Sequence, residues 1–555
     1  MSKKALFSFA MVSLLGVGAG IAQTGGTPAN DWPTWGYDQE RTGWNRGETT
    51  LSPKNVGRLK MQWTAELGVP TDNRVLSTMT APVIAGGVQT ASGAKDILYI
   101  LGANDVLYAV DASSGQRLWE KSYPNPIKPA KAADWLCPNT ANATPTVDKA
   151  RGLVFFVPSD GKLRAVSLAD GAEKMTPVEF VPPFARAWSL NLVDEIVYTT
   201  SGRACGEVQD LRSPMGAAAL SGLVRKGDGP LLDASAVQAA DTRDLSKPSV
   251  TRFYTSGARP AAPWGRGSTA KGPDGSIYLE TSDGLYDPAA GNFSTSILRL
   301  SPHAARLVDS FTPRVYKHNN QKDLSGSASP VVFSFKGRTL VAVSQKEAVL
   351  RILDATKMGG DDHMTPLFES SKLGNDQETG TDPGRGVWGA ITTYETPDGR
   401  RFLYLPMLGN PSKDAPVFPA TNGPIPNGSV MAFEVLEKDG KIVAEARWTS
   451  HDMVMPDPPV VANGVLYALQ SAGQAMQNYA KPGDKRMPRD VSAVLRSTPV
   501  TNLRLFAYDA VSGKPLYDSK QVMKGWVHFS EPVVALGKVF VVTHDAKVHA
   551  FGLGR

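Results

Sequence analysis

Apolar and polar residues alternate along the chain in short runs that recur with the same outline. The clearest runs are Ile97–Glu120, Leu153–Met175 and Leu503–Asp518, the first reading ILYILGANDVLYAVDASSGQRLWE. Each predicts a strand, a tight turn, a second strand, a polar turn with glycine, and a third strand that ends near a large residue. The polar turns Asp111–Gly115 and Asp509–Gly513 combine a side-chain acceptor with a residue that tolerates positive φ. A repeat of this kind is typical of the blades of a β-propeller.

Weaker copies of the outline fill the rest of the chain. A Pro-Val-Val or Pro-Val-Ile opener recurs, and proline fits the first residue of a strand because no ladder amide is needed there. The openers begin at Pro82, Pro330, Pro459 and Pro532. Openers and closing residues together predict eight blades, near residues 80–120, 143–175, 187–256, 264–312, 327–360, 387–450, 457–519 and 530–555. Seven blades remain the alternative, because the third stretch carries a long polar insertion. The closing aromatics Trp119 and Tyr517 are expected to dock between neighbouring blades.

One strand has no blade of its own. Asn55–Glu66 (NVGRLKMQWTAE) precedes the first blade, and the last blade lacks its outer strand. Pairing the two would close the ring and remove the free sheet edges. We therefore expect an all-β fold, an eight-bladed propeller of four-stranded antiparallel blades closed by an N-terminal strand, forming a single domain over residues 23–555.

The first 22 residues resemble a signal peptide. Lys3 and Lys4 precede the apolar run Ala5–Ala19, and Gly20-Ile21-Ala22 offers small residues for cleavage. We expect a periplasmic or secreted protein with no membrane span, because no later run is long and apolar enough. Cleavage removes two lysines, which lowers the formal charge from +6 to +4. No cluster of lysine and arginine indicates nucleic-acid binding.

Cysteine and histidine usage excludes several kinds of chemistry. The two cysteines, Cys137 and Cys205, lie in turn-rich segments, and an oxidising compartment favours a disulfide between them. The chain has no CxxC, so a zinc site is not expected, and no CxxCH, so no c-type haem is attached. The seven histidines are scattered, and there is neither a GxSxG nor a phosphate-binding loop.

The N-terminal stretch and the blades carry a family resemblance. Residues 31–63, DWPTWGYDQERTGWN…LSPKNVGRLKMQW, resemble the opening of pyrroloquinoline quinone (PQQ)-dependent alcohol dehydrogenases, and the blades resemble the PQQ-type repeat. The chain is identified, over about residues 31–553, as a member of the quinoprotein alcohol dehydrogenase-like superfamily. The repeat does not specify the cofactor, because an outer-membrane barrel-assembly scaffold protein uses it without PQQ.

The resemblance implies a catalytic site at one mouth of the central channel. In the family a Lys or Arg eight residues before the Asp of a strand binds the quinone carbonyls, and Lys346 stands eight before Asp354. The family's metal-binding Asn corresponds to Asp283, a candidate ligand for Ca²⁺ or a lanthanide. The stretch that matches the family's base contains no Asp, so Asp287 is the candidate base, with Asp283 the next carboxylate. A surface lysine and plain turn aspartates are the structural alternatives.

Aromatic and cationic residues complete the expected cofactor site. Trp264 (PWGRGS) and Trp388 (GVWGA) are flanked by glycines that leave a ring face open for stacking. Arg266 follows Trp264 by two residues and is the candidate partner of a PQQ carboxylate. Core packing and a structural salt bridge are the alternatives for these residues. The family's disulfide of adjacent cysteines is absent from the sequence.

Two functions follow from these residues. The first is a PQQ-dependent dehydrogenase that oxidises a small alcohol or sugar and passes electrons to a separate carrier. The second is a PQQ-free propeller that binds a protein or a polysaccharide as a scaffold. The missing base and the missing cysteine pair favour the second, while Lys346, Asp283 and the two tryptophans favour the first.

Overall fold

The computed structural model describes residues 31–68, 79–129, 140–204, 232–256, 261–380, 384–471 and 502–554. The expected signal peptide and both cysteines lie outside these ranges, so cleavage and the disulfide remain predictions. Within these ranges no helix has the length and apolar character needed to cross a membrane.

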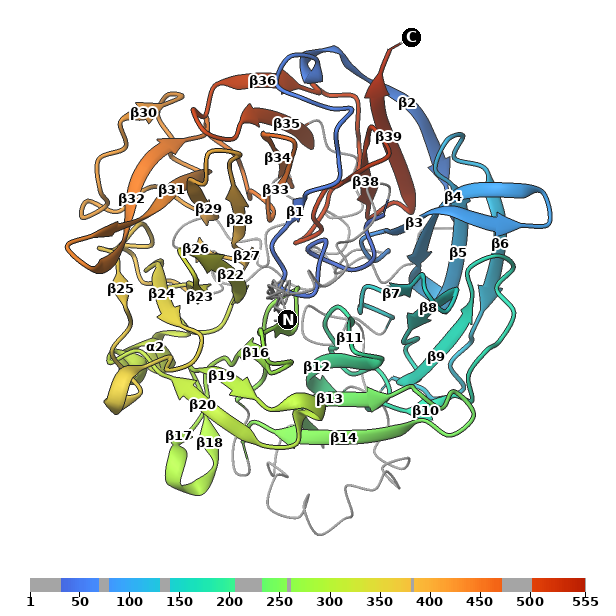
Figure 1. The fold of residues 1–555 in the computed structure, drawn as a ribbon, viewed down its shortest axis with the longest axis horizontal. Coiled ribbons are helices and arrows are strands. Elements are labelled where there is room, and N and C mark those ends of the chain that lie inside the picture. Colours follow the sequence, from blue (N-terminus) through green and yellow to red (C-terminus); the bar gives the residue numbers. More distant parts are fainter. Residues whose placement is uncertain are drawn as a thin grey trace, which may run out of the picture.

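The chain forms an eight-bladed β-propeller, as expected, and the seven-bladed alternative is excluded (Figure 1). Blades 1 to 3 are β3 (Val83–Thr90), β4 (Gly93–Leu101), β5 (Val106–Asp111), β6 (Arg117–Ser122); β7 (Thr146–Asp148), β8 (Leu153–Phe156), β9 (Lys162–Ser167), β10 (Val178–Glu179); and β11 (Asn191–Val193), β12 (Ile196–Ala204), β13 (Leu232–Asp241), β14 (Ser249–Tyr254). Blades 4 and 5 are β15 (Ala270–Lys271), β16 (Ile277–Glu280), β19 (Ile297–Leu300), β20 (Leu307–Phe311); and β22 (Val331–Phe335), β23 (Arg338–Val343), β24 (Arg351–Asp354), β25 (Phe368–Glu369).

The last three blades complete the ring. They are β28 (Thr392–Glu395), β29 (Arg401–Leu408), β31 (Gly428–Lys438), β32 (Lys441–Thr449), with β26 (Gly386–Val387) and β30 (Ala420–Thr421) at the ends; β33 (Val460–Ala462), β34 (Val465–Gln470), β35 (Arg504–Asp509), β36 (Pro515–Asp518); and β37 (Val533–Ala535), β38 (Lys538–Thr543), β39 (Lys547–Leu553), β2 (Leu59–Glu66). The expected closure is confirmed, because β2 pairs antiparallel with β39 from Leu59–Leu553 to Glu66–Lys547.

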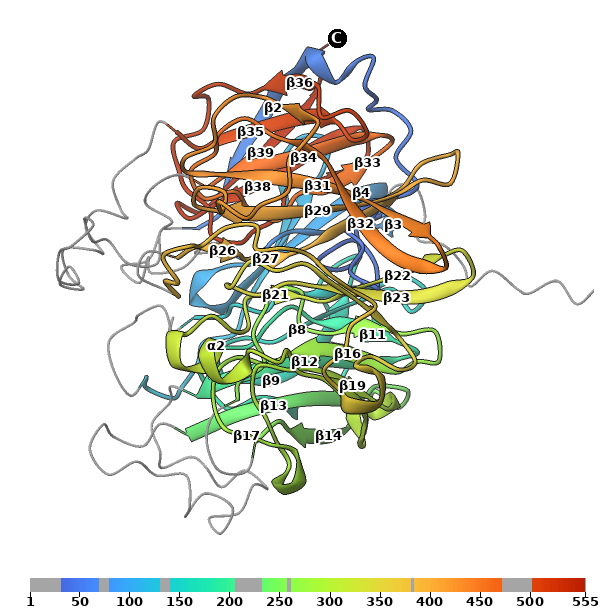
Figure 2. The ribbon, with the colours of Figure 1, turned by 90° about the vertical axis from the view of Figure 1, so that its left-hand side faces the viewer.

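Shorter elements lie between the blades. They are β1 (Trp44–Asn45), β17 (Tyr286–Asp287), β18 (Asn292–Phe293), β21 (Ala328–Ser329), β27 (Gly389–Ala390), α2 (Tyr316–Lys322) and the 3₁₀ turns Val56–Arg58, Ala103–Asp105, Pro288–Ala290, Pro302–Ala304 and Gly360–Asp362. In Figure 2, α2 lies toward the same left-hand face as β21, β26 and β27. The sequence pattern predicted neither α2 nor the β17–β18 hairpin.

Burial explains why the blade strands read as they do. Every residue of β34 is buried, because a middle strand packs against neighbouring blades on both sides. The outer strand β6 has no buried residue, and its charged residues Arg117 and Glu120 are exposed. Large apolar side chains from adjacent blades interleave, as where Val83 and Tyr99 of blade 1 share a core with Val154 and Phe156 of blade 2.

Closing tryptophans dock on the glycine of the next blade's polar turn. A Cβ added at Gly115, Gly171 or Gly513 would lie 2.6, 2.9 or 2.5 Å from the indole of Trp63, Trp119 or Trp448 respectively. All three glycines have positive φ. Trp119 therefore docks between blades 1 and 2 as expected from the sequence, and the same contact links blades 8 to 1 and 6 to 7.

Residues 31–45, the axial segment, run around the centre of the ring and bind all eight blades (Figure 1). Trp32 exchanges two backbone hydrogen bonds with Ile84 of blade 1, at 3.0 and 2.8 Å. Backbone N–H groups of blades 2, 4, 5, 6 and 7 then donate to the segment's carbonyls, in chain order: Val147 to Pro33, Lys271 to Gln39, Val332 to Glu40, Thr393 to Thr42 and Val461 to Gly43.

Side chains of the axial segment reach the two remaining blades. Thr34 Oγ1 donates to Leu190 O at 2.8 Å, beside blade 3, and Asn45 Nδ2 donates to Val534 O of blade 8 at 2.7 Å. Arg41 is buried and donates to Thr269 O and Leu190 O, both at 2.9 Å. Burial lowers the pKa of Arg41 to about 9. The segment therefore lies at the centre of the ring and is bonded to blades on every side of it.

Candidate active site

The segments that lead into the innermost strands bring large side chains together in one cluster. Trp264 and Arg266 precede β15, Trp388 precedes β28, and Phe529 precedes β37. These four side chains line one cavity of about 10 Å³, room for about one water molecule. The structure thus brings Trp264, Arg266 and Trp388 together, although they are far apart in the sequence.

Trp264 belongs to a layered group of aromatic and cationic side chains. Its ring meets that of Trp188 edge to face, with centroids 5.0 Å apart. The Arg186 guanidinium lies 4.6 Å from the centroid of Trp264 and 4.8 Å from that of Trp188. Both additional residues precede β11 just as Trp264 and Arg266 precede β15, and this shared position is the signal by which the sequence could have indicated them.

Trp388 forms the second aromatic pair. Its ring stacks on Phe529 with centroids 5.5 Å apart and planes 6° from parallel. Lys346 Nζ lies 5.2 Å from the Trp388 centroid, a cation–π distance. Gly386 makes this approach possible: its φ is +88°, and a Cβ there would lie 2.0 Å from Lys346 O.

Arg266 spans the channel. Its guanidinium donates to His528 O of the segment before blade 8 at 3.0 Å and to Asn142 O before blade 2 at 3.3 Å. Burial lowers the pKa of Arg266 to about 10, partly opposed by the charge of Asp457. Burial in turn raises the pKa of Asp457 to about 7, although Ser471 and the Phe529 N–H, at 2.6 Å, donate to its carboxylate.

Lys346 lies in the turn between β23 and β24, as its spacing from Asp354 predicts, and its side chain is 5% exposed. Its Nζ forms an ion pair of 2.5 Å with Asp323 Oδ1, whose side chain is 41% exposed. Asp323 is the residue that sequence reasoning missed. It ends a short polar stretch before the Pro330 opener, which could have marked it as a channel-mouth loop residue.

The two other sequence candidates lie elsewhere. Asp287 is exposed and caps the 3₁₀ turn Pro288–Ala290, accepting from Ala290 N at 3.3 Å. No hydrogen bond or ion pair among the described residues joins Asp287 to Lys346. Asp283 is exposed in the loop after β16, next to Gly284, whose N–H donates to Asn320 at 3.0 Å.

A planar polyanion such as PQQ fits the chemistry of this cluster. Arg186, Arg266 and Lys346 supply three buried cations, and Trp264 and Trp388 supply rings of the kind on which a flat ring stacks. The cavity between them has room for about one water molecule, so these side chains would have to move apart to admit such a ligand. Buried polar atoms without a hydrogen-bond partner in the described chain, among them Trp35 Nε1, Asn142 Oδ1 and Ser530 Oγ, add donors and acceptors nearby.

A metal ion fits less well. The described residues contain no group of three His, Cys, Asp or Glu side chains close enough to hold an ion. Asp283 alone would leave most of a Ca²⁺ coordination sphere unfilled.

Comparisons with known proteins bear on the repeat and the fold. A PQQ-repeat family model described as outer membrane protein assembly factor BamB matches residues 55–209. No curated protein matches the chain.

Solved structures match over almost the whole chain. The quinohemoprotein alcohol dehydrogenase from Comamonas testosteroni is 15% identical with a TM-score of 0.58, over 95% of this chain and 82% of the other. The quinohemoprotein alcohol dehydrogenase ADHIIG from Pseudomonas putida HK5 is 14% identical (TM-score 0.55; 95% and 81%), and a europium-containing methanol dehydrogenase is 12% identical (TM-score 0.58; 95% and 98%). The fold of the chain is therefore that of the quinoprotein alcohol dehydrogenases, which agrees with the resemblance of its repeat to the PQQ type.

Proposed function

We propose that the protein is a PQQ-dependent dehydrogenase of small alcohols or sugars that acts in the periplasm or outside the cell. The observation that carries the proposal is the 2.5 Å pair of Lys346 with Asp323 beside Trp388, at the mouth that also collects Trp264, Arg266 and Arg186. The similarity of the fold to that of quinohemoprotein alcohol dehydrogenases supports the same function. The chain has no CxxCH for a haem, so electrons would pass to a separate carrier.

Each residue has a distinct part in the proposal. The chemistry that PQQ supplies when bound is that of an ortho-quinone, a two-electron acceptor. Trp264 and Trp388 would support its plane, and Arg266 and Arg186 would pair with its carboxylates. The Lys346 ammonium stabilises negative charge that develops within its reach.

Asp323 is our proposed general base, in place of Asp287. Its carboxylate is partly exposed, so a substrate hydroxyl can reach it, and the ion pair with Lys346 holds it in place. The proton that it accepts can leave to solvent through the same exposed side. No step is assigned to a metal, and Asp283 remains a proposed oxygen ligand from sequence alone.

The test is a titration of the purified protein with PQQ, with and without Ca²⁺ or La³⁺, followed by tryptophan quenching. Saturable binding that Lys346→Ala weakens about tenfold or more, and dye-linked oxidation of an alcohol or sugar, would support the proposal. Asp323→Asn is the matched variant that should keep PQQ binding and lose turnover. Absence of binding at high micromolar PQQ would reject it and favour the PQQ-free scaffold, whose partner a periplasmic pull-down would then seek.

A further inference from the structure

Helix α2 connects blade 4 to blade 5 and ends at Asp323. The Asp323 residue is the C-cap, with left-handed φ of +54°, and its N–H donates to Asn319 O. The next N–H, that of Leu324, donates to the same carbonyl at 2.8 Å. The backbone of Asn319 thus sets the turn from which the Asp323 carboxylate projects.

The side chain of Asn319 reaches the other partner of the pair. Asn319 is 1% exposed, and its Nδ2 donates to Glu347 Oε2 at 2.6 Å and to Gln345 Oε1 at 3.3 Å. These two residues flank Lys346. In addition, Glu347 N donates to Leu324 O at 3.1 Å, so the lysine turn and the aspartate turn are also joined through the backbone.

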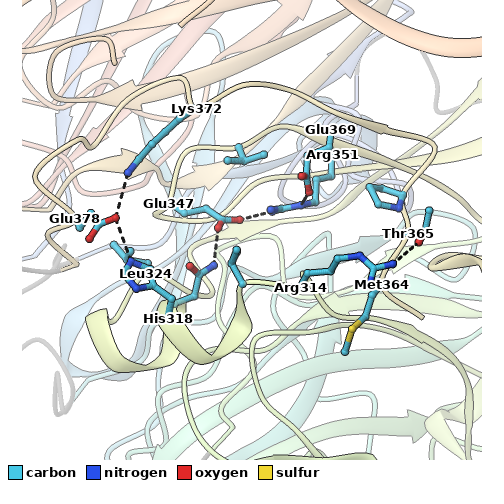
Figure 3. A pocket seen from close by; sticks show the side chains of 14 residues that line it. Arg314, His318, Leu324, Glu347, Arg351, Met364, Thr365, Glu369, Lys372 and Glu378 are labelled. Atoms are coloured by element: carbon cyan, nitrogen blue, oxygen red, sulfur yellow. Dashed lines mark hydrogen bonds and ion pairs between the residues drawn. The ribbon is translucent and has the colours of Figure 1, made fainter. Parts of the chain in front are cut away.

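Glu347 is itself held from its far side. Its other carboxylate oxygen forms an ion pair with buried Arg351, which also pairs with Glu369 at 2.6 Å. Figure 3 shows Glu347 and Arg351 on the wall of a cavity of about 310 Å³ that Asn319 and Leu324 also line. Glu347, which accepts from the Asn319 amide, is therefore held in place by Arg351. The Asn319 side chain connects this fixed carboxylate to α2.

The neighbouring asparagine holds a different loop. Asn320 Oδ1 accepts from Gly284 N at 3.0 Å and Thr295 Oγ1 at 2.9 Å, and its Nδ2 donates to Ser294 Oγ at 3.1 Å. Asn320 thus ties α2 to the loop of Asp283, and within the described residues no hydrogen bond joins its side chain to the lysine turn. Two adjacent amides on one short helix therefore serve two separate sides of the site.

We propose that Asn319 is the positioning residue of the Lys346–Asp323 pair, fixing the lysine turn through its amide and the aspartate turn through its carbonyl. The ion pair alone is insufficient for this, because a partly exposed pair is weak and screened by salt. A role of Asn319 in catalysis rests on the proposed function. Its role in holding the Lys346–Asp323 pair does not, because the geometry of the pair is independent of any reaction.

The experiment measures how fast acetic anhydride acetylates Lys346 in the unloaded protein, by peptide mass spectrometry. Asn319→Ser removes the amide, and we expect Lys346 to react about tenfold faster, the change that loss of one hydrogen bond to a charged group gives. Asn320→Ser is the matched control, since it removes three side-chain hydrogen bonds from the same helix, against two for Asn319→Ser, and should leave the rate within about twofold. Thermal unfolding verifies that each variant folds.

A reversed pair provides the rescue. Asn319→Asp alone sets two carboxylates against each other and should raise the acetylation rate further. Combining it with Glu347→Gln restores a donor and an acceptor with exchanged roles and should return the rate toward that of the parent. Equal rates in Asn319→Ser and Asn320→Ser, or a double variant no slower than Asn319→Asp, would overturn the proposal.

Turnover of the PQQ-loaded protein separates the two proposals. If the acetylation pattern holds and no variant, the parent included, oxidises any substrate, the positioning role stands and the dehydrogenase is rejected. If the parent turns over and the acetylation pattern is flat, Asn319 is rejected as the positioning residue while the dehydrogenase stands.

Discussion

At the scale of single residues, burial decides which groups at the channel mouth carry charge. Arg266 and Asp457 are both buried, and burial disfavours the charged form of each, so the pKa of the arginine falls and that of the aspartate rises. The pKa of the Asp457 carboxyl is thereby raised to about 7, whereas the Arg266 guanidinium, with a pKa of about 10, stays charged at neutral pH. The positive charge of Arg266 is therefore compensated less at pH 6 than at pH 8.

The raised pKa of Asp457 predicts a pH dependence of stability. Between its ordinary pKa of 3.8 and about 7 the unfolded chain ionises this group and the folded chain does not, so its contribution is fully present below 3.8 and is lost as pH rises to 7. Asp457→Asn should thus gain stability relative to the parent by a few kcal/mol between pH 4 and pH 7 and level off above. Urea unfolding at several pH values measures the difference; exposed Asp414→Asn is the control, and a flat difference for Asp457→Asn would contradict the prediction.

Asp323 predicts a kinetic signature of a general base. Asp323→Asn keeps the size of the side chain and its contact with Lys346 but cannot accept a proton, so kcat should fall about 10²- to 10⁴-fold while KM changes little. Steady-state kinetics with an artificial electron acceptor measures both constants. Asp287→Asn tests the alternative base: if it loses as much activity as Asp323→Asn, the proposed role of Asp323 is wrong.

Sequence reasoning reached some of these residues and not others for a physical reason. Trp264, Arg266, Trp388 and Lys346 stand at fixed offsets from blade strands, and the structure places all four at one mouth. Asp323 follows a helix that interrupts the repeat, so its offset from the blade pattern carried no information. What marks Asp323 as the proposed base is its ion pair with Lys346, a contact that exists only in the folded chain.

At the scale of elements, the contact of a tryptophan with a glycine turn joins blades that share no hydrogen-bonded strand. Trp448 of β32 packs on Gly513 in the turn before β36 and donates from Nε1 to Ala510 O at 3.1 Å. The sequence predicted both the polar turns and the docking of closing aromatics, because each is local. It did not predict which turn receives which ring, since that depends on the spacing of assembled blades.

Substituting the turn glycine should therefore cost more than backbone strain. Gly513→Ala places a Cβ 2.5 Å from the Trp448 ring at a φ of +72°, whereas Gly440→Ala has the same φ in an open hairpin turn. We expect Gly513→Ala to lower the free energy of unfolding by about 1–3 kcal/mol more than Gly440→Ala, the cost of overpacking. Chemical denaturation of both variants tests this, and equal losses would mean that the ring moves aside freely.

At the scale of the whole molecule, the axial segment connects blades that are not neighbours in the ring, as Arg266 also does. Its backbone and side chains bind the inner strands of all eight blades. The alternating pattern of the blades predicted the ring and its closure by β2, but not this segment. Residues 31–45 have no strand period, because their hydrogen-bond partners are spread over the entire sequence.

Deleting residues 23–45 should therefore loosen the ring as a whole. We expect faster hydrogen exchange in β3, β7, β22 and β28 alike and a lower unfolding midpoint, because buried N–H groups in every direction lose their acceptors. Arg41→Met keeps the segment and should confine the change to blades 3 and 4, beside Leu190 and Thr269. Exchange that increases only in β33, where β1 pairs, would contradict the prediction.

The order in which the axial segment meets the blades has a consequence for how this protein can change over time. From Trp32 to Asn45 the chain passes the inner strands of the eight blades once, in their order around the ring, so its length matches a ring of eight blades. If a blade were duplicated, the axial segment would be too short to bind every blade, and if a blade were deleted it would be too long. This holds even though each blade is a self-similar unit. The axial segment is synthesised before the blades that it binds. Its length therefore ties the number of blades to a stretch of sequence that lies outside all of them.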